Sequence, residues 1–170
     1  MDKTEQVAQQ HLRSRGFTDV RYEPDGNVPP DFLVDARIAV EVRRLNQHEE
    51  TTGTPRGLEA VSIPLLHRMR KLLPALGPAR GESWYVTYTF ERPLLEQLDR
   101  NIRLCVDEKA RKVAKVRSRY PEWWLLLVDH VAHGLELEDH EELRRLLSMS
   151  HSWDKILVVN PLHPAQVFEL

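Results

Sequence analysis

Residues 29–44, PPDFLVDARIAVEVRR, decide the fold because apolar side chains recur there at every second position. This period is typical of a β-strand with one face in the core. We place a tight turn at DAR, residues 35–37, between the two alternating runs. We therefore expect a β-hairpin, with strands near 31–35 and 37–44.

The turn fixes which residues face each other across this hairpin. If Val34 pairs with Ile38, Asp31 lies directly opposite Glu41, and residues so placed have Cβ atoms about 5 Å apart on the same face. Arg43, two positions beyond Glu41, points to that face as well. One face then carries Phe32, Val34, Ile38, Val40 and Val42, and the other carries Asp31, Leu33, Ala39, Glu41 and Arg43.

Two carboxylates that face each other need a compensating charge, because like charges destabilise a strand pair. A divalent cation supplies it, and Mg²⁺ binds through one or two carboxylates while it keeps water or phosphate oxygens as its other ligands. The alternative is an ordinary surface hairpin with a solvated acidic face. In that case Arg43 or Arg37 simply pairs with Glu41.

A helix expected over residues 2–15 is a candidate to cover the acidic face. Its Glu5 shares a helical stripe with Ala8 and Leu12, so this carboxylate turns inward with the apolar side chains. A carboxylate in such a position needs a partner, and a metal site is one.

The rest of the chain predicts alternating helices and strands. Further helices are expected over 58–73, 94–118 and 138–148, and further strands over 18–23, 83–91, 122–131, 154–160 and at the C-terminus. The order α-β-β-β-α-β-α-β-α-β predicts an α/β fold, in which helices flank a central mixed sheet.

The composition is that of an ordinary globular protein and suits one domain over residues 1–170, with 41% hydrophobic and 29% charged residues. The formal net charge of −2 excludes a globally basic nucleic-acid binder but leaves a local basic patch open. Cys105 is the only cysteine, which excludes an internal disulfide and a cysteine metal cluster. Neither a membrane-spanning run nor a secretory signal is recognisable, so we expect a cytoplasmic protein without membrane contact.

The motif Pro30-Asp31, nine intervening residues, and Glu41-Val42-Arg43, with Glu5 on a preceding helix, resembles the PD-(D/E)xK nuclease superfamily. This superfamily includes restriction endonucleases, Holliday-junction resolvases and repair nucleases. The resemblance implies a restriction endonuclease-like core of order α-β-β-β-α-β and covers roughly residues 2–130. Among its members, the chain is most similar to an uncharacterised bacterial branch.

The resemblance also implies roles for individual residues. Asp31 and Glu41 would bind Mg²⁺ or Mn²⁺, with the carbonyl of Val42 facing the metal and Glu5 as an additional ligand or orienting group. Arg43 stands where the superfamily has lysine. Because arginine keeps its proton, Arg43 cannot help to generate hydroxide, but it can still clamp a phosphate.

Two further features belong to this expectation. Gln47 resembles a glutamine that follows the motif in certain branches. The long helix expected over 94–118 is basic, and Arg111, Lys115 and Arg119 recur every four residues, so they could line one face and contact a phosphate backbone. Ordinary solvated cations near a helix C-terminus would show the same pattern. The basic residues of this segment are Arg100, Arg103, Lys109, Arg111, Lys112, Lys115, Arg117 and Arg119.

Three functions follow from the sequence. The first is metal-dependent hydrolysis of DNA, in a protein that could act as a homodimer because nucleases that cut both strands are commonly dimers. The second is a catalytically degenerate relative that binds nucleic acid or a protein without cleavage, which Arg43 favours. The third is a partner-dependent accessory protein whose hairpin carboxylates are solvated.

Overall fold

Helices and strands alternate along the part of the chain that the computed structural model describes, which comprises residues 1–45, 48–49, 56–57, 92–129, 141, 144–145, 150–165 and 167–170. The N-terminal elements are α1 (Lys3–Ser14), β1 (Val20–Tyr22), β2 (Phe32–Val34), β3 (Ile38–Leu45), β4 (His48–Glu49) and β5 (Arg56–Gly57). The C-terminal elements are α3 (Arg92–Val113), the 3₁₀ helix η2 (Arg117–Arg119), β6 (Glu122–Asp129), β7 (Lys155–Val159) and β8 (Val167–Glu169).

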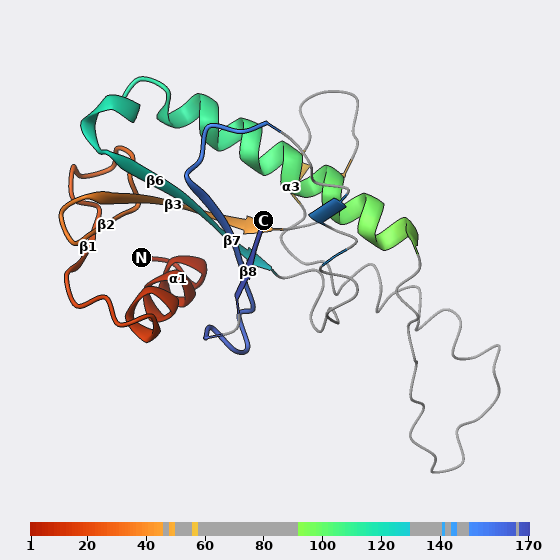
Figure 1. The fold of residues 1–170 in the computed structure, drawn as a ribbon, viewed down its shortest axis with the longest axis horizontal. Helices are drawn as coiled ribbons and strands as arrows, with labels where there is room; N and C mark the ends of the chain where they lie inside the picture. The colour runs from red at the N-terminus through yellow and green to blue at the C-terminus, as the bar shows by residue number, and fades with distance from the viewer. Residues whose placement is uncertain are drawn as a thin grey trace, which may run out of the picture.

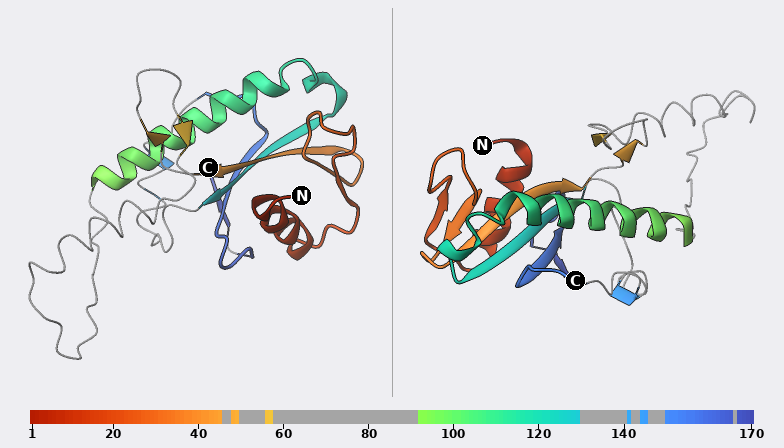
Figure 2. Two further views of the ribbon diagram at one scale, coloured as in Figure 1. Left: turned by 180° about the vertical axis from the view of Figure 1, so that it is seen from behind. Right: turned by 90° about the horizontal axis from the view of Figure 1, so that it is seen from above.

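A six-stranded mixed sheet of order β1-β2-β3-β6-β7-β8 forms the centre of the molecule. The pairs β1–β2, β2–β3 and β7–β8 are antiparallel, whereas β3–β6 and β6–β7 are parallel. Parallel neighbours need a crossover, and α3 lies on the connection between β3 and β6. The helices α1 and α3 lie on opposite faces of this sheet (Figures 1 and 2). The α/β class expected from the sequence is confirmed.

The hairpin between β2 and β3 has the expected register. Val34 pairs with Ile38, and the pairing continues to Phe32 and Val40, which places Asp31 at the position opposite Glu41. The backbone N–H of Arg37 donates to the carbonyl of Val34 at 3.1 Å and closes the turn. Asp35 and Ala36 within it both have left-handed backbone angles, with φ of 48° and 53°.

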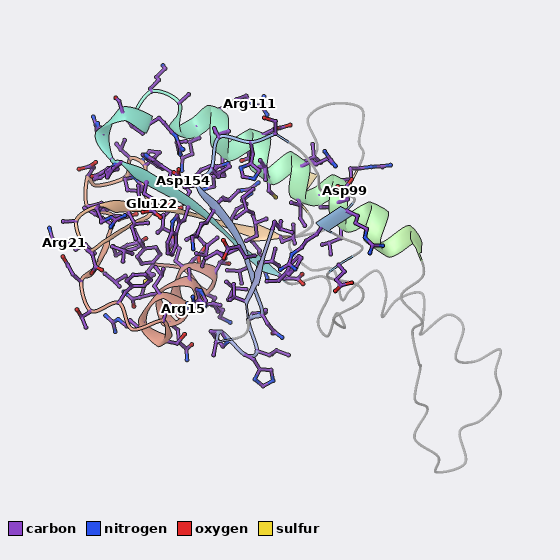
Figure 3. All side chains as sticks on the ribbon, viewed as in Figure 1. Arg15, Arg21, Asp99, Arg111, Glu122 and Asp154 are labelled. Carbon is purple, nitrogen blue, oxygen red and sulfur yellow. The ribbon has the colours of Figure 1, made fainter. Side chains whose placement is uncertain are left out.

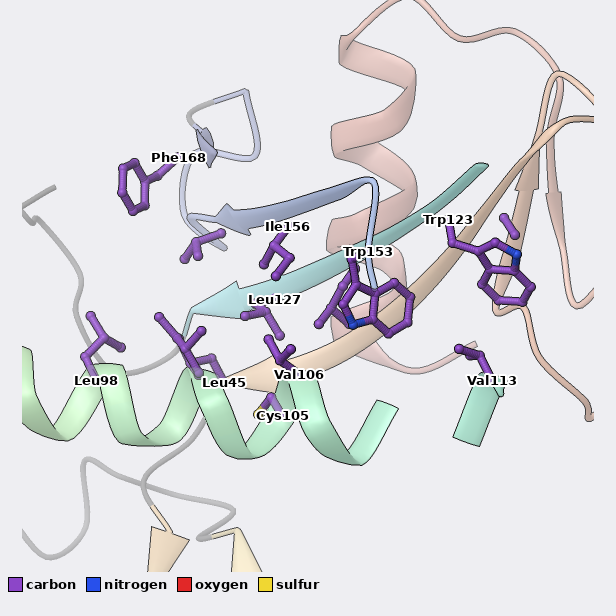
Figure 4. Close-up of a cluster of buried hydrophobic side chains, with 14 residues drawn as sticks. Leu45, Leu98, Cys105, Val106, Val113, Trp123, Leu127, Trp153, Ile156 and Phe168 are labelled. Atoms are coloured by element: carbon purple, nitrogen blue, oxygen red, sulfur yellow. The ribbon is translucent and has the colours of Figure 1, made fainter. Parts of the chain in front are cut away.

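The two faces of the sheet bury separate apolar clusters. The cluster beneath α1 draws on the alternate positions of β2 and β3, namely Phe32, Val34, Ile38, Val40 and Val42 together with Ala8 and Leu12 of the helix. The cluster beneath α3 joins one stripe of that helix to the other face (Figure 4), through Ala39, Leu45, Leu98, Ile102, Cys105, Val106, Val113, Leu125 and Leu127 among others. The expectation that the first helix covers the face of Asp31 and Glu41 is therefore wrong, since α3 occupies that side.

The long helix also ends earlier than expected. Val113 is the last residue of α3 and its last buried apolar side chain. The N–H of Val116 then bonds the carbonyl of Val113 at 2.9 Å, an i to i+3 bond that tightens the chain into η2. Lys115 and Arg119 consequently lie beyond the helix rather than on one face with Arg111.

The other expected elements agree with the structure where it describes them. The strands expected over 18–23, 122–131 and 154–160, and the C-terminal strand, correspond to β1, β6, β7 and β8. The helix expected over 58–73 and the strand expected over 83–91 lie outside the described residues, as does most of 138–148. No helix in the described ranges is long and apolar enough to cross a membrane.

The left-handed turn generates the first prediction. Ala36 has a Cβ that crowds the backbone at φ of 53°, a conformation that costs a residue other than glycine about 1–2 kcal/mol. We expect Ala36→Gly to raise the free energy of unfolding by about 0.5–1 kcal/mol in urea denaturation, after glycine's own entropic cost. Ala110→Gly, within α3, should lower it by about 1 kcal/mol, and equal destabilisation by both changes would contradict the expected relief of strain.

A histidine on α1 generates the second prediction. His11 is buried, and its Nδ1 lies 2.6 Å from the carbonyl oxygen of Pro164, in the loop before β8. Burial lowers the pKa of His11, and nearby Arg15 lowers it further, although the bond to Pro164 opposes both. Because the unfolded chain binds the proton more readily, stability is fully present above about pH 6.5 and is lost as the pH falls below it.

The His11→Asn variant should show a smaller drop in melting temperature between pH 7 and pH 5 than wild type, because the asparagine amide can still donate to Pro164 but cannot take up a proton. The control His151→Asn changes an exposed histidine and should keep the pH dependence of wild type. An unchanged drop in His11→Asn would show that another group governs the loss of stability in acid.

Candidate active site

A lysine from α3 joins the two carboxylates of the hairpin. The Nζ of Lys109 lies 2.6 Å from Oε2 of Glu41 and 3.3 Å from Oδ2 of Asp31, so one ammonium group donates to both. Asp31 immediately precedes β2, Glu41 lies in the middle of β3, and Lys109 lies on the crossover helix α3. The structure thus brings together Asp31 and Glu41 as the sequence predicts, and adds a cation that the motif does not contain.

Backbone hydrogen bonds hold Asp31 in place just before β2. Its carbonyl accepts from the N–H of Glu23 at 2.9 Å, which extends the pairing of β1 with β2. Its Oδ2 accepts from the N–H of Val42 at 2.7 Å, where the backbone pairing of β2 with β3 has already ended. Because the N–H and C=O of one strand residue point to the same edge, the Val42 carbonyl also faces the side of Asp31. Its role as a metal ligand stays a prediction.

Burial strengthens the electrostatic interactions within this cluster. The side chains of Glu41, Lys109 and Asp31 are 0%, 8% and 19% exposed, so the solvated acidic face considered above is wrong for Glu41. Burial raises the pKa of the Glu41 carboxyl group, and the ammonium of Lys109 opposes this. Burial alone would lower the pKa of Lys109, but the negative charges of Glu41 and Asp31 outweigh it, and the pKa lies above its ordinary value.

Arg43 lies on the same face of β3 but has a different partner. Its Nη2 donates to Oε2 of Glu108 on α3 at 2.8 Å, and its side chain is 36% exposed. Arg37 likewise pairs with Glu122, at 2.7 Å. Neither arginine therefore neutralises Glu41. Arg43, which stands where the motif has lysine, instead connects β3 to α3 through Glu108.

The structure does not bring Glu5 to the pair. Its Oε2 accepts from the backbone N–H of Asp2 at 2.6 Å and from the hydroxyl of Tyr22 at 3.0 Å. Together with the bond from its own N–H to Asp2, this is a capping box at the start of α1. The inward position of Glu5, which suggested a metal ligand, is explained by this cap and by the hydrogen bond from Tyr22 of β1.

The remaining predicted residues are scattered or lie outside the described part of the chain. Arg111 is exposed on the outer side of α3 (Figure 3), and its Nε donates to the carbonyl of Asp107. Lys115 is exposed after the helix, and Arg119 in η2 pairs with Asp25 at 3.3 Å. The three do not form the expected stripe, because the helix ends at Val113. Gln47 lies outside the described residues.

Sequence reasoning missed the role of Lys109, although a signal was present. The buried side chains Leu98, Ile102, Cys105 and Val113 recur at helical spacing, and Lys109 falls on the same stripe between the last two. A cation on the core-facing stripe of a helix needs a buried carboxylate as partner. Glu41, which is flanked by the apolar residues Val40 and Val42 in the sequence, was a candidate for this carboxylate.

The carboxylate oxygens of Asp31 and Glu41 suit a hard cation that takes only one or two ligands from the protein. Among the described residues, no group of three or more His, Cys, Asp or Glu side chains is arranged to hold a metal ion. The cluster instead offers two carboxylates, and Oε1 of Glu41 is buried without a hydrogen-bond partner. A buried carboxylate oxygen with no donor is a free oxygen ligand, and two carboxylates match the preference of Mg²⁺.

Comparison with known proteins does not identify the site. No family model matches the chain, and a search of curated proteins finds no significant match. Function therefore has to be inferred from the cluster of Asp31, Glu41 and Lys109 itself.

The buried cluster generates the third prediction. Lys109→Met leaves two carboxylates facing each other with no buried cation, and we expect the free energy of unfolding to fall by about 3–5 kcal/mol at neutral pH. Adding Glu41→Gln should restore part of the loss, with a coupling of about 1–3 kcal/mol in a double-mutant cycle from urea denaturation.

A matched cycle on the exposed pair of Asp19 and Arg21 should give a coupling below about 1 kcal/mol, since that pair is 42% and 58% exposed. Strictly additive effects of Lys109→Met and Glu41→Gln would show that the buried contact does not operate in solution.

Proposed function

We propose that this chain is a metal-dependent phosphodiesterase that cleaves DNA and belongs to the PD-(D/E)xK fold type. One observation carries the proposal: a buried lysine donates to both carboxylates of the motif. A pair of carboxylates with an adjacent lysine is the chemical set that the resemblance calls for. Here the lysine is Lys109, from a helix rather than from β3.

The arrangement of the elements supports this proposal. If the separate two-stranded sheet of β4 and β5 is set aside, the described elements α1, β1, β2, β3, α3 and β6 follow one another as α-β-β-β-α-β. The first three strands form an antiparallel meander, and β6 then returns parallel to β3. Asp31 immediately precedes β2 and Glu41 lies in the middle of β3, so both carboxylates belong to neighbouring strands of this meander.

Asp31 and Glu41 would hold a Mg²⁺ or Mn²⁺ ion, which would supply an activated water and stabilise the negative charge that develops on the phosphoryl group. The free Oε1 of Glu41 is the atom that favours this fit. The N–H of Val42 fixes the direction of the Asp31 carboxylate through Oδ2. The protein's own part is therefore to present two oriented oxygen donors in a largely dry setting.

Lys109 is the cation beside the two carboxylates that Arg43 does not supply. Burial alone would lower the pKa of Lys109, but the charges of Glu41 and Asp31 outweigh it and hold the pKa above its ordinary value. Lys109 is therefore protonated, and its ammonium group would stabilise the negative charge that develops on the phosphoryl group.

The same contact favours one rival, a catalytically degenerate protein of this fold that binds nucleic acid without cleaving it. An ammonium group that already neutralises two carboxylates can hold a fold together without any metal. The two functions differ in one measurable property, which is cleavage in the presence of Mg²⁺ or Mn²⁺.

The fourth prediction tests this. We expect the purified chain to cleave single-stranded, double-stranded or branched DNA with Mg²⁺ or Mn²⁺ and to be inactive in EDTA. Asp31→Asn, Glu41→Gln and Lys109→Gln should each lower the rate by at least ~100-fold, because each removes a group that acts on the reacting phosphate or water.

The control Asp19→Asn removes an exposed carboxylate that pairs with Arg21 and not with the cluster, and it should cleave like wild type. Circular dichroism should show that all variants are folded. Absence of cleavage with both metals, or undiminished cleavage in Asp31→Asn and Glu41→Gln, would refute the nuclease. DNA binding without cleavage would establish the degenerate rival.

A further inference from the structure

A second lysine of α3 reaches the same carboxylate as Lys109. The Nζ of Lys112 lies 3.6 Å from Oε2 of Glu41, the oxygen that also accepts from Lys109. The two lysines are three positions apart, so they project from the same side of the helix. Glu41 thus faces two ammonium groups from one turn of α3.

The two lysines differ sharply in exposure. The side chain of Lys109 is 8% exposed and that of Lys112 is 49% exposed, although both approach a carboxylate that is fully buried. A separation of 3.6 Å is longer than a hydrogen bond, so Lys112 is attracted to Glu41 by charge without being fixed in direction. Lys112 therefore connects the buried cluster to solvent with a side chain that can turn toward an incoming anion.

The charges explain which anion it would take. The carboxylates of Asp31 and Glu41 balance the ammonium groups of Lys109 and Lys112, so the cluster is formally neutral. A divalent cation on the carboxylates would leave it with two positive charges, and Glu41 would no longer attract Lys112. A phosphate oxygen of a phosphodiester then becomes the best partner for this exposed ammonium.

The other candidate on this face, Arg43, is less free to bind a phosphate. Its guanidinium group already donates to Glu108 at 2.8 Å, whereas the contact of Lys112 is 0.8 Å longer and is not a hydrogen bond. Arg43, which the resemblance predicts to bind a phosphate, thus already forms the contact between β3 and α3.

On the basis of the function proposed above, we propose that Lys112 is a substrate-binding residue that holds the backbone phosphate of the nucleic acid at the mouth of the site. Lys109 works inside the cluster and Lys112 at its surface. The proposal concerns the affinity for the phosphodiester and not the bond-breaking step.

The test measures binding separately from cleavage. A fluorescein-labelled single-stranded DNA oligonucleotide is titrated with the 170-residue chain by fluorescence anisotropy, in Ca²⁺ and in EDTA, at several NaCl concentrations. The variants are Lys112→Gln, Lys112→Arg and the control Lys3→Gln, which removes the same charge from an exposed position on α1, on the opposite face of the sheet.

We expect Lys112→Gln to weaken binding by about 3–10-fold and to reduce the slope of log K against log [NaCl] by ~0.7, the contribution of one contact to a single-stranded phosphate. Lys112→Arg should restore the slope, and Lys3→Gln should match wild type. In cleavage, Lys112→Gln should raise KM by about the same factor while kcat stays within about twofold.

The outcomes separate this proposal from the nuclease itself. A Lys112-dependent salt slope without any cleavage would support Lys112 and refute the nuclease. Cleavage by wild type with an unchanged slope and KM in Lys112→Gln would refute Lys112 and leave the nuclease standing. A wild-type chain that does not bind the oligonucleotide would overturn the phosphate-binding role.

Discussion

The ammonium group of Lys109 is the constraint on which the centre of this structure depends. It lies between Glu41 and Asp31 and so joins α3, β3 and the start of β2. Each of these charges would be costly to bury alone, and like-charged carboxylates would push the hairpin apart. Removal of Lys109 would leave both carboxylates without a buried cation, so the same contact holds α3 over the hairpin and sets the charge of the cluster.

Much of the fold follows from local patterns in the sequence. The alternation through β2 and β3 and the turn between them were enough to predict the register that brings Asp31 opposite Glu41. The covering helix was not predictable in the same way. The apolar stripe of Val7, Ala8 and Leu12 could pack against either face of the sheet. Only the three-dimensional packing shows that α1 covers the face that carries Phe32, Val34 and Val40.

The ends of helices depend on short-range details that a periodic pattern does not contain. The apolar residues at helical spacing, which continue to Val116, predict a helix to residue 118. The chain instead tightens after Val113, where the buried stripe ends, and enters η2 and then β6. The expected row of Arg111, Lys115 and Arg119 fails for this reason, whereas Lys109 and Lys112 lie within the helix and keep their helical spacing.

The linear motif predicts two of the three residues in the cluster but not the third. Asp31 and Glu41 are close in sequence and are related by strand geometry, but Lys109 is 68 residues from Glu41 along the chain. Arg43 in the lysine position suggests a silent site only if the cation has to come from β3. A buried ammonium acts through distance and dielectric, not through chain position. The helix that crosses from β3 to β6 places such an ammonium group against both carboxylates, while Arg43 pairs with Glu108 and connects that helix to the strand.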